Sequence, residues 1–367
     1  MCNLHKHIVC LSCLLGLLLV TPPVHGHEVA PDTKTFSIKD FIFEHIGDAY
    51  VWRITTWGDK QISIPLPIIA FSREKGWNLF MSSKLHHGAH NGFYVARGGD
   101  HEGKLVELNR AGEEVRPLDL SLTKNAAAIM INSIILIIIV MSLTRWYKKR
   151  PARSVPRGFL GALDIFVMSI HDELIKPCIG PDYKRYAPYL LTVFFFILIN
   201  NVMGILPFFP GGAATTGNIA VTFVLALSTF IAVNVFGNKE YWREILWPDV
   251  PIWMKTPIPL IPVIELFGIF TKPFALMVRL FVNIMAGHAM VLGICCLIFL
   301  TVSMGSTFNV GMSALSVVMM IMMNLLELLV AYIQAYVFTM LSAVFIGLSR
   351  PQAHHRKPTP KPKIQPI

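Results

Sequence analysis

The sequence predicts an all-α polytopic membrane protein with about five crossings, two long, tilted carboxy-terminal helices and a small, partly β, extracytoplasmic amino-terminal region. Composition is the first reason: of 367 residues, 54% are apolar and only 15% are charged, whereas soluble domains carry about 25% charged residues. The second reason is a series of apolar runs between residues 126 and 349. The third is that basic clusters flank these runs, as expected of cytoplasmic loops.

The first 26 residues have the layout of a secretory signal peptide. Lys6 precedes an apolar stretch from Ile8 to Val20, and small or turn-forming residues surround Gly26. A charged start, an apolar core and a small-residue site are typical of a cleaved signal, with a short anchoring helix as the alternative. The six cysteines of the chain show no spacing typical of a zinc site or a disulfide framework.

Residues 27–123 form the only long polar stretch and are expected to be the extracytoplasmic region. Short alternating segments, such as Tyr50–Ile54 and Gln61–Ile64, favour β-strands. Because this region has no cysteine to cross-link it, we expect it to depend on the membrane domain or on a partner.

Two features of the same region favour ligand binding only weakly. Gly98–Lys104 has the spacing of a phosphate-binding loop, but Leu105 stands where a Ser or Thr would bind magnesium. Four histidines lack the cysteines or helical spacing of a metal site; they are His86, His87, His90 and His101. The sequence therefore predicts no cofactor and no metal.

Five apolar stretches are expected to cross the membrane, since one crossing needs about 20 apolar residues. Three have that length, and the last two are about twice as long: 126–144, 187–208, 217–237, 260–302 and 308–349. A helix of about 42 residues is about 63 Å long, against a hydrocarbon core of about 30 Å, so each long stretch is a hairpin or a tilted helix. Neither has a strong turn at its middle, which favours tilted helices. Residues 158–186, of mixed polarity, are expected to form an interfacial helix and loop.

The distribution of charge agrees with five crossings. With residues 27–123 outside, the first crossing brings the six cations between Arg145 and Arg157 to the cytoplasm, and the fifth brings the basic tail, residues 350–367, to the same side. Topology therefore explains the net charge of +10, and no nucleic-acid partner is expected.

Six polar residues in the two long stretches carry the functional prediction, because an ionisable group inside a membrane costs several kcal/mol and is functional by default. They are Glu265, Arg279, Asn283, His288, Glu327 and Gln334. His288 lies about 13 Å along the helix from Arg279, and Glu327 lies about 10 Å from Gln334. An antiparallel pair with Gln334 level with Arg279 therefore brings the imidazole and the carboxylate to a common depth.

Glu265 lies four turns before Arg279 and shares its helix face to within about 40°. An acid, a permanent cation and a titratable His/Glu pair together suggest two half-paths for protons with a barrier between them. The alternatives are structural: Arg279 could pair with an acid or snorkel, the His/Glu pair could be a buried link, and Glu265 could be solvated. The amides, including Asn201 in the second crossing, could simply hydrogen-bond between helices.

The run from Lys272 to His288 resembles the signature of subunit a of F-type ATP synthases, Arg-Leu-Phe-x-Asn-x-x-Ala-Gly followed by Glu or His. Gln334–Phe338 resembles the final-helix motif of that family, and Asn200–Pro207 is similar to its Asn-Leu-x-Gly-Leu-x-Pro. Phe41–Ile46 resembles its amino-terminal segment. The resemblance covers residues 120–349, and the chain departs from the common pattern in its signal peptide and in the length of the 27–123 region.

The resemblance implies a proton-translocating stator subunit of the F0 sector, which is not catalytic on its own, in a bacterial inner membrane. It implies that Arg279 faces the c-subunit ring and that His288 and Glu327 line the outer half-channel, with acid and histidine exchanged between the helices. Glu265 then lies at the inner half-channel, with Asn283, Gln334 and Asn201 as supporting polar groups. The implied partners are the c-ring, the b-subunit peripheral stalk, the F1 sector and the lipid bilayer. A self-contained secondary transporter is the alternative, but it would more often show an inverted repeat.

Overall fold

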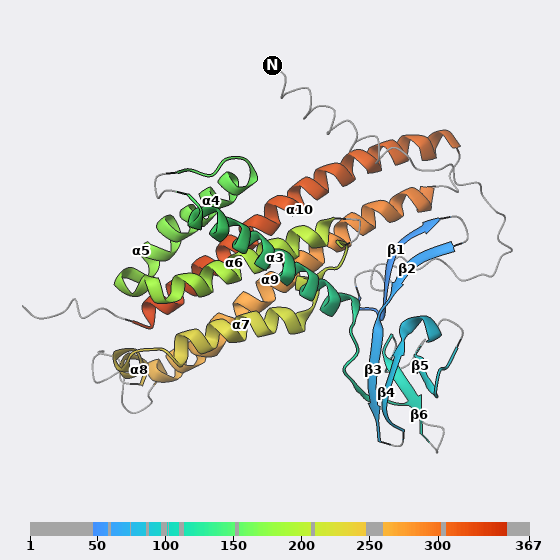
Figure 1. Cartoon of the computed structure of the whole chain (residues 1–367), viewed down its shortest axis with the longest axis horizontal. Helices are drawn as coiled ribbons and strands as arrows, with labels where there is room; N and C mark the ends of the chain where they lie inside the picture. Colours follow the sequence, from blue (N-terminus) through green and yellow to red (C-terminus); the bar gives the residue numbers. More distant parts are fainter. Residues whose placement is uncertain are drawn as a thin grey trace, which may run out of the picture. The chain divides into compact units, whose positions relative to one another are not determined.

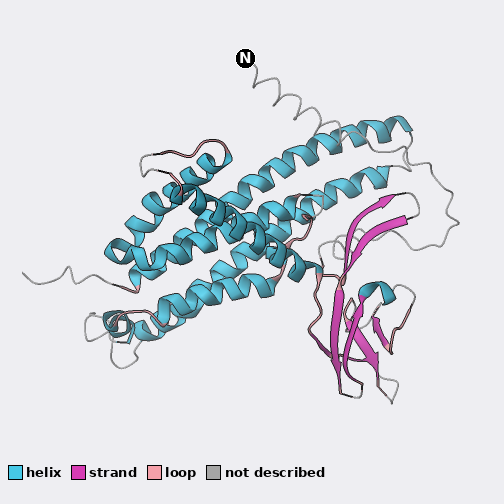
Figure 2. Ribbon diagram, viewed as in Figure 1, coloured by secondary structure: helices cyan, strands magenta, loops and turns pink. Residues whose placement is uncertain are grey.

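The structure is a computed structural model, and it describes residues 47–57, 60–73, 75–85, 88–96, 101, 103–109, 114–150, 154–206, 210–246, 260–301 and 306–350. The predicted signal peptide, the Phe41–Ile46 segment and the basic tail beyond residue 350 lie outside these residues. Described residues before 124 form short strands, and those from 124 onward are mostly helical (Figure 2).

The strand region confirms the prediction of a small, partly β segment. Its strands form three antiparallel groups: β1 (Val51–Trp57) with β2 (Lys60–Pro65); β4 (Gly76–Met81), β3 (Pro67–Ser72) and β8 (Leu118–Asp119); and β5 (Phe93–Val95), β6 (Leu105–Leu108) and β7 (Glu114–Val115). A short 3₁₀ turn, η1 (Ser82–Leu85), follows β4.

The core of this region lies between the second and third groups of strands. Strict alternation on β3 buries Ile68 and Ala70, which pack with Phe80, Phe93 and Leu105. The Tyr50 hydroxyl, at the rim of this core, donates a hydrogen bond to Asp119 and accepts one from the Leu105 amide. Burial, together with the bond to the carboxylate, raises the pKa of Tyr50 well above its usual value.

The strand region is attached to the start of α3 (Lys124–Lys148). Trp52 and Leu66 pack against Ala127 and Ala128 of that helix. The Asp48 carboxylate accepts a hydrogen bond from the Asn125 amide at 3.1 Å. The region therefore leans on the membrane domain, as its lack of cysteines suggests.

The helical part begins with α3 and ends with two long helices that lie side by side (Figure 1). Its further elements are α4 (Phe159–Ser169), η2 (Ile170–Ile175), α5 (Lys176–Ile179), η3 (Gly180–Asp182), α6 (Tyr183–Ile205), η4 (Thr215–Gly217), α7 (Ile219–Asn234), α8 (Lys239–Leu246), α9 (Leu260–Thr301) and α10 (Ser306–Leu348). Within the described residues, four helical segments are long and apolar enough to cross a membrane: 124–148, 159–205, 263–298 and 308–348.

The helix lengths refine the five predicted crossings. α9 and α10 are continuous over 42 and 43 residues, so the hairpin alternative is wrong for both. The expected crossing at 217–237 contains α7, which has only 16 residues. A helix of that length is about 24 Å long, shorter than a hydrocarbon core of about 30 Å.

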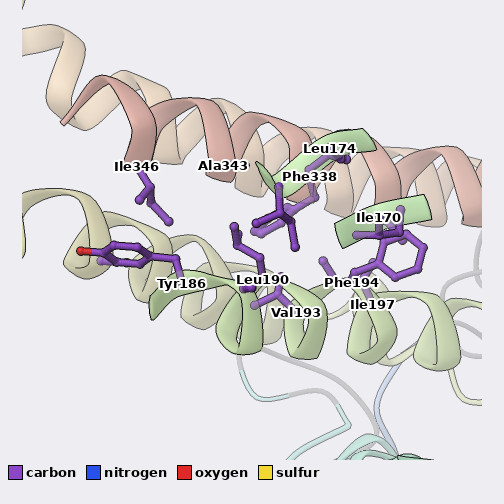
Figure 3. Close-up of a cluster of buried hydrophobic side chains, with 14 of the residues drawn as sticks. Ile170, Leu174, Tyr186, Leu190, Val193, Phe194, Ile197, Phe338, Ala343 and Ile346 are labelled. Carbon is purple, nitrogen blue, oxygen red and sulfur yellow. The ribbon is translucent and has the colours of Figure 1, made fainter. Parts of the chain in front are cut away.

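The loop predicted within residues 158–186 is wrong. Residues 159–186 form α4, η2, α5, η3 and the start of α6, which follow one another without a loop, and residues of α4, η2 and α5 pack into the helical core. Ile170 and Leu174 are buried there with Leu190 and Phe194 of α6 and Phe338 of α10 (Figure 3). Apolar residues at helical spacing bury one face of the segment, and its polar residues occupy the other.

α10 packs closely because one of its faces carries small residues every four positions. This stripe consists of Ala331, Ala335, Thr339, Ala343 and Gly347, and such stripes let membrane helices approach each other. A Cβ added to Gly347 would lie 2.1 Å from the Cys178 carbonyl oxygen. Any larger side chain at this position would therefore push α5 away.

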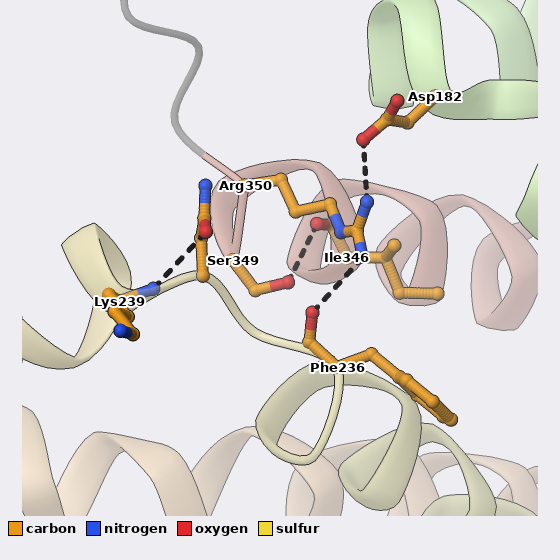
Figure 4. A network of polar contacts seen from close by, with 7 residues as sticks. Asp182, Phe236, Lys239, Ile346, Ser349 and Arg350 are labelled. Carbon is orange, nitrogen blue, oxygen red and sulfur yellow. Dashed lines mark hydrogen bonds and ion pairs between the residues drawn. The ribbon is translucent and has the colours of Figure 1, made fainter.

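A group of polar contacts ties the chain together where α10 ends (Figure 4). The Arg350 guanidinium pairs with Asp182, before α6, and donates a hydrogen bond to the Phe236 carbonyl, after α7. The Asn238 amide bonds to the Ser349 carbonyl at 3.0 Å. These contacts fix the ends of α6, α7 and α10 relative to one another.

Candidate functional site

His288 of α9 and Glu327 of α10 meet inside the helical domain. His288 Nδ1 lies 2.6 Å from Glu327 Oε1, and the two side chains are 16% and 5% exposed. The structure thus brings together the imidazole and the carboxylate that the antiparallel register predicts. A buried carboxylate needs such a partner, because burying an uncompensated charge costs several kcal/mol.

Two glycines make room for this pair. A Cβ on Gly287 would lie 3.0 Å from Glu327 Oε1, and a Cβ on Gly204 of α6 would lie 3.6 Å from His288 Nε2. α6, α9 and α10 therefore converge on the His288–Glu327 pair. Neither glycine was predicted as a site residue, although each stands within one of the motifs that resemble the family.

Gln334 corrects the predicted register. Asn283 Nδ2 donates a hydrogen bond to Gln334 Oε1 at 2.8 Å, so Gln334 is level with Asn283 rather than with Arg279. Gln334 lies seven residues from Glu327, whereas Arg279 lies nine residues from His288. Once His288 and Glu327 are in contact, Gln334 therefore falls short of Arg279 by about one half-turn. Its buried Nε2 has no hydrogen-bond partner among the described residues.

Arg279 contrasts with the buried pair because its side chain is exposed. Across the described part of the chain, no residue forms an ion pair or a hydrogen bond with its guanidinium. Three other residues on this side of α9 are exposed too: Ala275, Val282 and Ala286, which lie four, three and seven positions from Arg279. A guanidinium thus stands on a bare face of α9 whose neighbouring side chains are small, so another helix can approach closely.

Asn201 joins α6 to α10 one turn from Glu327. It is buried, accepts a hydrogen bond from Thr216 Oγ1 at 2.7 Å, and donates one to the Ala331 carbonyl at 3.4 Å. Beside it, Asn200 Oδ1 accepts hydrogen bonds from Asn132 Nδ2 of α3 and from Thr215 Oγ1. Sequence analysis missed Asn132, although a polar side chain in an otherwise apolar span is the signal that identifies such residues.

Glu265 lies far along α9 from the other polar groups and is about half exposed. Its carboxylate is 3.9 Å from Lys272 Nζ, with the two side chains 49% and 41% exposed. An ion pair this open contributes little to stability. Glu265 is thus held loosely and stays accessible from outside the chain.

Next to Lys272 the helices enclose a small cavity of about 20 Å³, lined by residues of α7, α8, α9 and α10, which is room for about one water molecule. The Tyr241 hydroxyl at its wall donates a hydrogen bond to Asn234 Oδ1 at 3.2 Å. Burial, with a smaller contribution from the Glu265 carboxylate, raises the pKa of Tyr241. This end of the domain therefore combines an acid, a cation and a small cavity whose lining is mostly apolar.

Fold and site together define a class of protein: a polytopic membrane protein with a buried acid–imidazole pair and, on one long helix, a guanidinium that no described residue pairs with. The family described as ATP synthase A chain matches residues 128–347. The chain belongs to this family, which confirms the resemblance found in its motifs and supports roles in ATP synthesis and proton transport within a membrane-embedded F0 sector. A second family, described only as a domain of unknown function, matches residues 41–125.

Several curated relatives are similar to this chain over about two thirds of its length. ATP synthase subunit a of Chlorobium phaeobacteroides is 40% identical over 242 residues, which is 65% of this chain and 67% of the relative. ATP synthase subunit a of Myxococcus xanthus is 40% identical over 261 residues, 68% of this chain and 80% of the relative. ATP synthase subunit a of Chloroherpeton thalassium is 37% identical over 248 residues, covering 66% and 70%.

Proposed function

We propose that the chain is the proton-translocating stator subunit of F0: it offers two half-channels to a rotating ring of c subunits and so couples proton flow to ATP synthesis. The guanidinium of Arg279 on α9, exposed and without a partner among the described residues, carries this proposal. A permanent cation in a membrane is costly unless an opposite charge compensates it. A carboxylate on each passing c subunit would supply that charge.

In this mechanism the His288–Glu327 pair serves the half-channel that opens to the outside. An imidazole can both accept and donate a proton, so a histidine in contact with a carboxylate can relay protons. The pair, or water ordered by it, delivers the proton to a c-subunit carboxylate. Asn283, Gln334 and Asn201 hold α9, α10 and α6 in register around it through their hydrogen bonds.

The neutralised c-subunit carboxylate leaves toward lipid, and after rotation it arrives at the inner half-channel near Glu265. As it approaches Arg279 it ionises, because a nearby cation lowers the pKa of a carboxyl group. The same cation repels protons and so separates the half-channels. The membrane potential biases the rotation, at about 2.3 kcal/mol per charge per 100 mV.

This proposal places the strand region outside the cytoplasm and the carboxy terminus inside, in a bacterial inner membrane. The b-subunit stalk holds the chain against the rotating ring, and the F1 sector performs the catalysis. The chain itself then performs no catalysis; it sets the path of the protons.

The test is ATP-driven acidification of inverted membrane vesicles carrying Arg279→Ala, with immunoblots to verify that the complex still contains the ring and the F1 sector. The matched control is Val282→Ala, an exposed position of the same face of α9. We expect Arg279→Ala to abolish pumping while assembly and the control stay intact. A passive proton leak through the variant would show that the guanidinium also separates the half-channels. Unchanged pumping would refute the proposal.

A further inference from the structure

One face of the β4–β3–β8 sheet is apolar and bare. The opposite face is covered, since Ile68 and Phe80 pack against Phe93 of β5. On the bare face, strand pairing places Ile69 opposite Leu79, and Phe71 opposite both Trp77 and Leu118. We call this the apolar sheet face; it consists of Ile69, Phe71, Trp77, Leu79, Met81 and Leu118.

The exposure of this face is unusual for a domain surrounded by water. Trp77 is 64% exposed, Leu79 is 74% exposed and Leu118 is 58% exposed. A sheet with one solvated face normally alternates apolar and polar residues, whereas this sheet is apolar on both faces. Contiguous apolar surface of this kind marks a contact with a partner or a membrane.

The attachment of the sheet identifies a lipid surface as the occupant. The Pro67 carbonyl, at the start of β3, accepts a hydrogen bond from the Leu122 amide, two residues before α3 begins. Leu118 and Leu120 are exposed just before the helix, and Met130 and Ile134 are exposed within it. Exposed apolar side chains thus occur on the sheet, on the link that follows it and on α3, a helix long and apolar enough to cross a membrane.

The residues around the face suit lipid head groups. Tryptophan concentrates at membrane interfaces, where its apolar ring and polar N–H are both accommodated. Exposed cations occupy the segments that border the sheet: Arg73 after β3, Lys84 after β4 and Arg116 before β8. Basic side chains next to an apolar surface are attracted to anionic lipids.

We propose that the apolar sheet face rests on the leaflet at which α3 enters the membrane, with Trp77 and Leu79 among anionic phospholipid head groups and the upper acyl chains. The region that matches only a family of unknown function is then a membrane-surface anchor for the start of α3. This inference does not depend on the proposed role of Arg279.

The test uses the assembled complex in vesicles of phosphatidylcholine and phosphatidylglycerol. Leu79→Cys is labelled with an environment-sensitive fluorophore, in a chain whose six native cysteines are replaced by alanine and that still pumps. The matched control is Leu108→Cys, a half-exposed leucine of β6 outside the apolar sheet face. A quencher on the upper acyl chain is compared with aqueous iodide.

We expect the lipid quencher to act several-fold more strongly on the Leu79 label than on the Leu108 label, and iodide to show the reverse order. Equal quenching of the two labels by iodide would overturn the proposal. So would a Leu79 label that neither quencher reaches, because a protein partner would then cover the face.

A second measurement needs no variant. A photoactivatable phospholipid is incorporated into vesicles with the unmodified complex, and cross-linked peptides are mapped after irradiation. Adducts concentrated on residues 76–81 rather than 105–108 support the proposal. Adducts confined to the membrane helices would overturn it.

Discussion

Two levels of α9 each carry an ionisable group on a long apolar helix, and they accommodate its charge in opposite ways. At His288 the ionisable group is mostly buried and paired within the chain, 2.6 Å from Glu327. At Arg279 the charge is exposed and unpaired within the described residues. The first level is electrostatically complete, whereas the second requires a counter-charge from outside the chain. The contrast matches the proposed function, in which the first level relays protons and the second meets the carboxylate of a passing c subunit.

The largest effect is expected from giving Arg279 a partner within the chain. Asn283→Asp places a carboxylate four residues from the guanidinium on the same helix face, where the two can pair. We expect ATP-driven acidification to fall by more than about tenfold, since a competing interaction of 1.4 kcal/mol is enough for that factor.

The control for this variant is Asn283→Leu. Both variants lose the amide donor that bonds to Gln334, but the leucine variant adds no charge. Equal pumping by the two variants would mean that the unpaired state of Arg279 has no importance.

The next effect concerns the level at which His288 and Glu327 pair with each other. Glu327→Ala or His288→Ala leaves one member of a buried pair alone, which costs about 3–5 kcal/mol when the charge remains. We expect low pumping and a reduced amount of the chain in the membrane. The double exchange, His288→Glu with Glu327→His, restores the pair and should pump better than either single variant. If the double exchange pumps as poorly as the two single variants, the pair is not the functional unit.

A smaller effect is expected at Gly287. The Cβ of Gly287→Ala would lie 3.0 Å from Glu327 Oε1, so the carboxylate must shift by a few tenths of an ångström. We expect pumping to fall about two- to fivefold, or by less than about 1 kcal/mol. Gly293→Ala on the same helix meets no atom within 4 Å and should leave the rate unchanged. Similar rates for the two variants would show that the pair tolerates displacement.

The smallest effect on pumping is expected far from α9. Tyr50→Phe removes the bonds to Asp119 and from the Leu105 amide, which should cost the strand region about 1–2 kcal/mol without changing the pumping rate. Hydrogen exchange of β6 and β8 in the complex measures the loss, and Tyr94→Phe, with its exposed bond to Glu114, is the milder control.

The Tyr50 contribution also has a defined pH dependence. The folded state raises the pKa of Tyr50 above its usual value of 10.0, so folding favours the neutral phenol. The stabilisation is therefore fully present below about pH 10 and is lost as the pH rises toward the raised pKa. A strand region whose protection from exchange is the same in Tyr50→Phe and in the parent chain would contradict this account.

Spacing within a helix was enough to predict contacts between neighbouring long helices. The distances from His288 and Glu327 to the other polar groups brought these two residues to one depth, but the same arithmetic misplaced Gln334. A difference of two residues changes both the depth of a side chain and the helix face that carries it. The observed contact, rather than the spacing, therefore decides which polar group of α9 Gln334 meets.

Other features were beyond the reach of local pattern. Asn132 and Asn200 are 68 residues apart, with all of α4, η2 and α5 between them, and nothing in either span shows that α3 packs on α6. The continuous helical structure of residues 159–186 was missed because polar residues lower the mean hydropathy of this segment, although Leu163, Val167, Ile170 and Leu174 have helical spacing. The bare face of the β4–β3–β8 sheet depends on strand pairing, which alternation alone does not specify.

The length of α9 has a geometric consequence for the path of the proton. To keep both ends of a helix of about 63 Å within a core of about 30 Å, the helix must tilt by about 60°. The 13 Å that separate Arg279 and His288 along the axis then become about 6 Å of depth and about 12 Å of sideways displacement. In the proposed function, the outer access point at the His288–Glu327 pair is thus displaced sideways from the barrier at Arg279. A proton that enters there would cross to the inner half-channel on a c-subunit carboxylate that moves around the circumference of the ring.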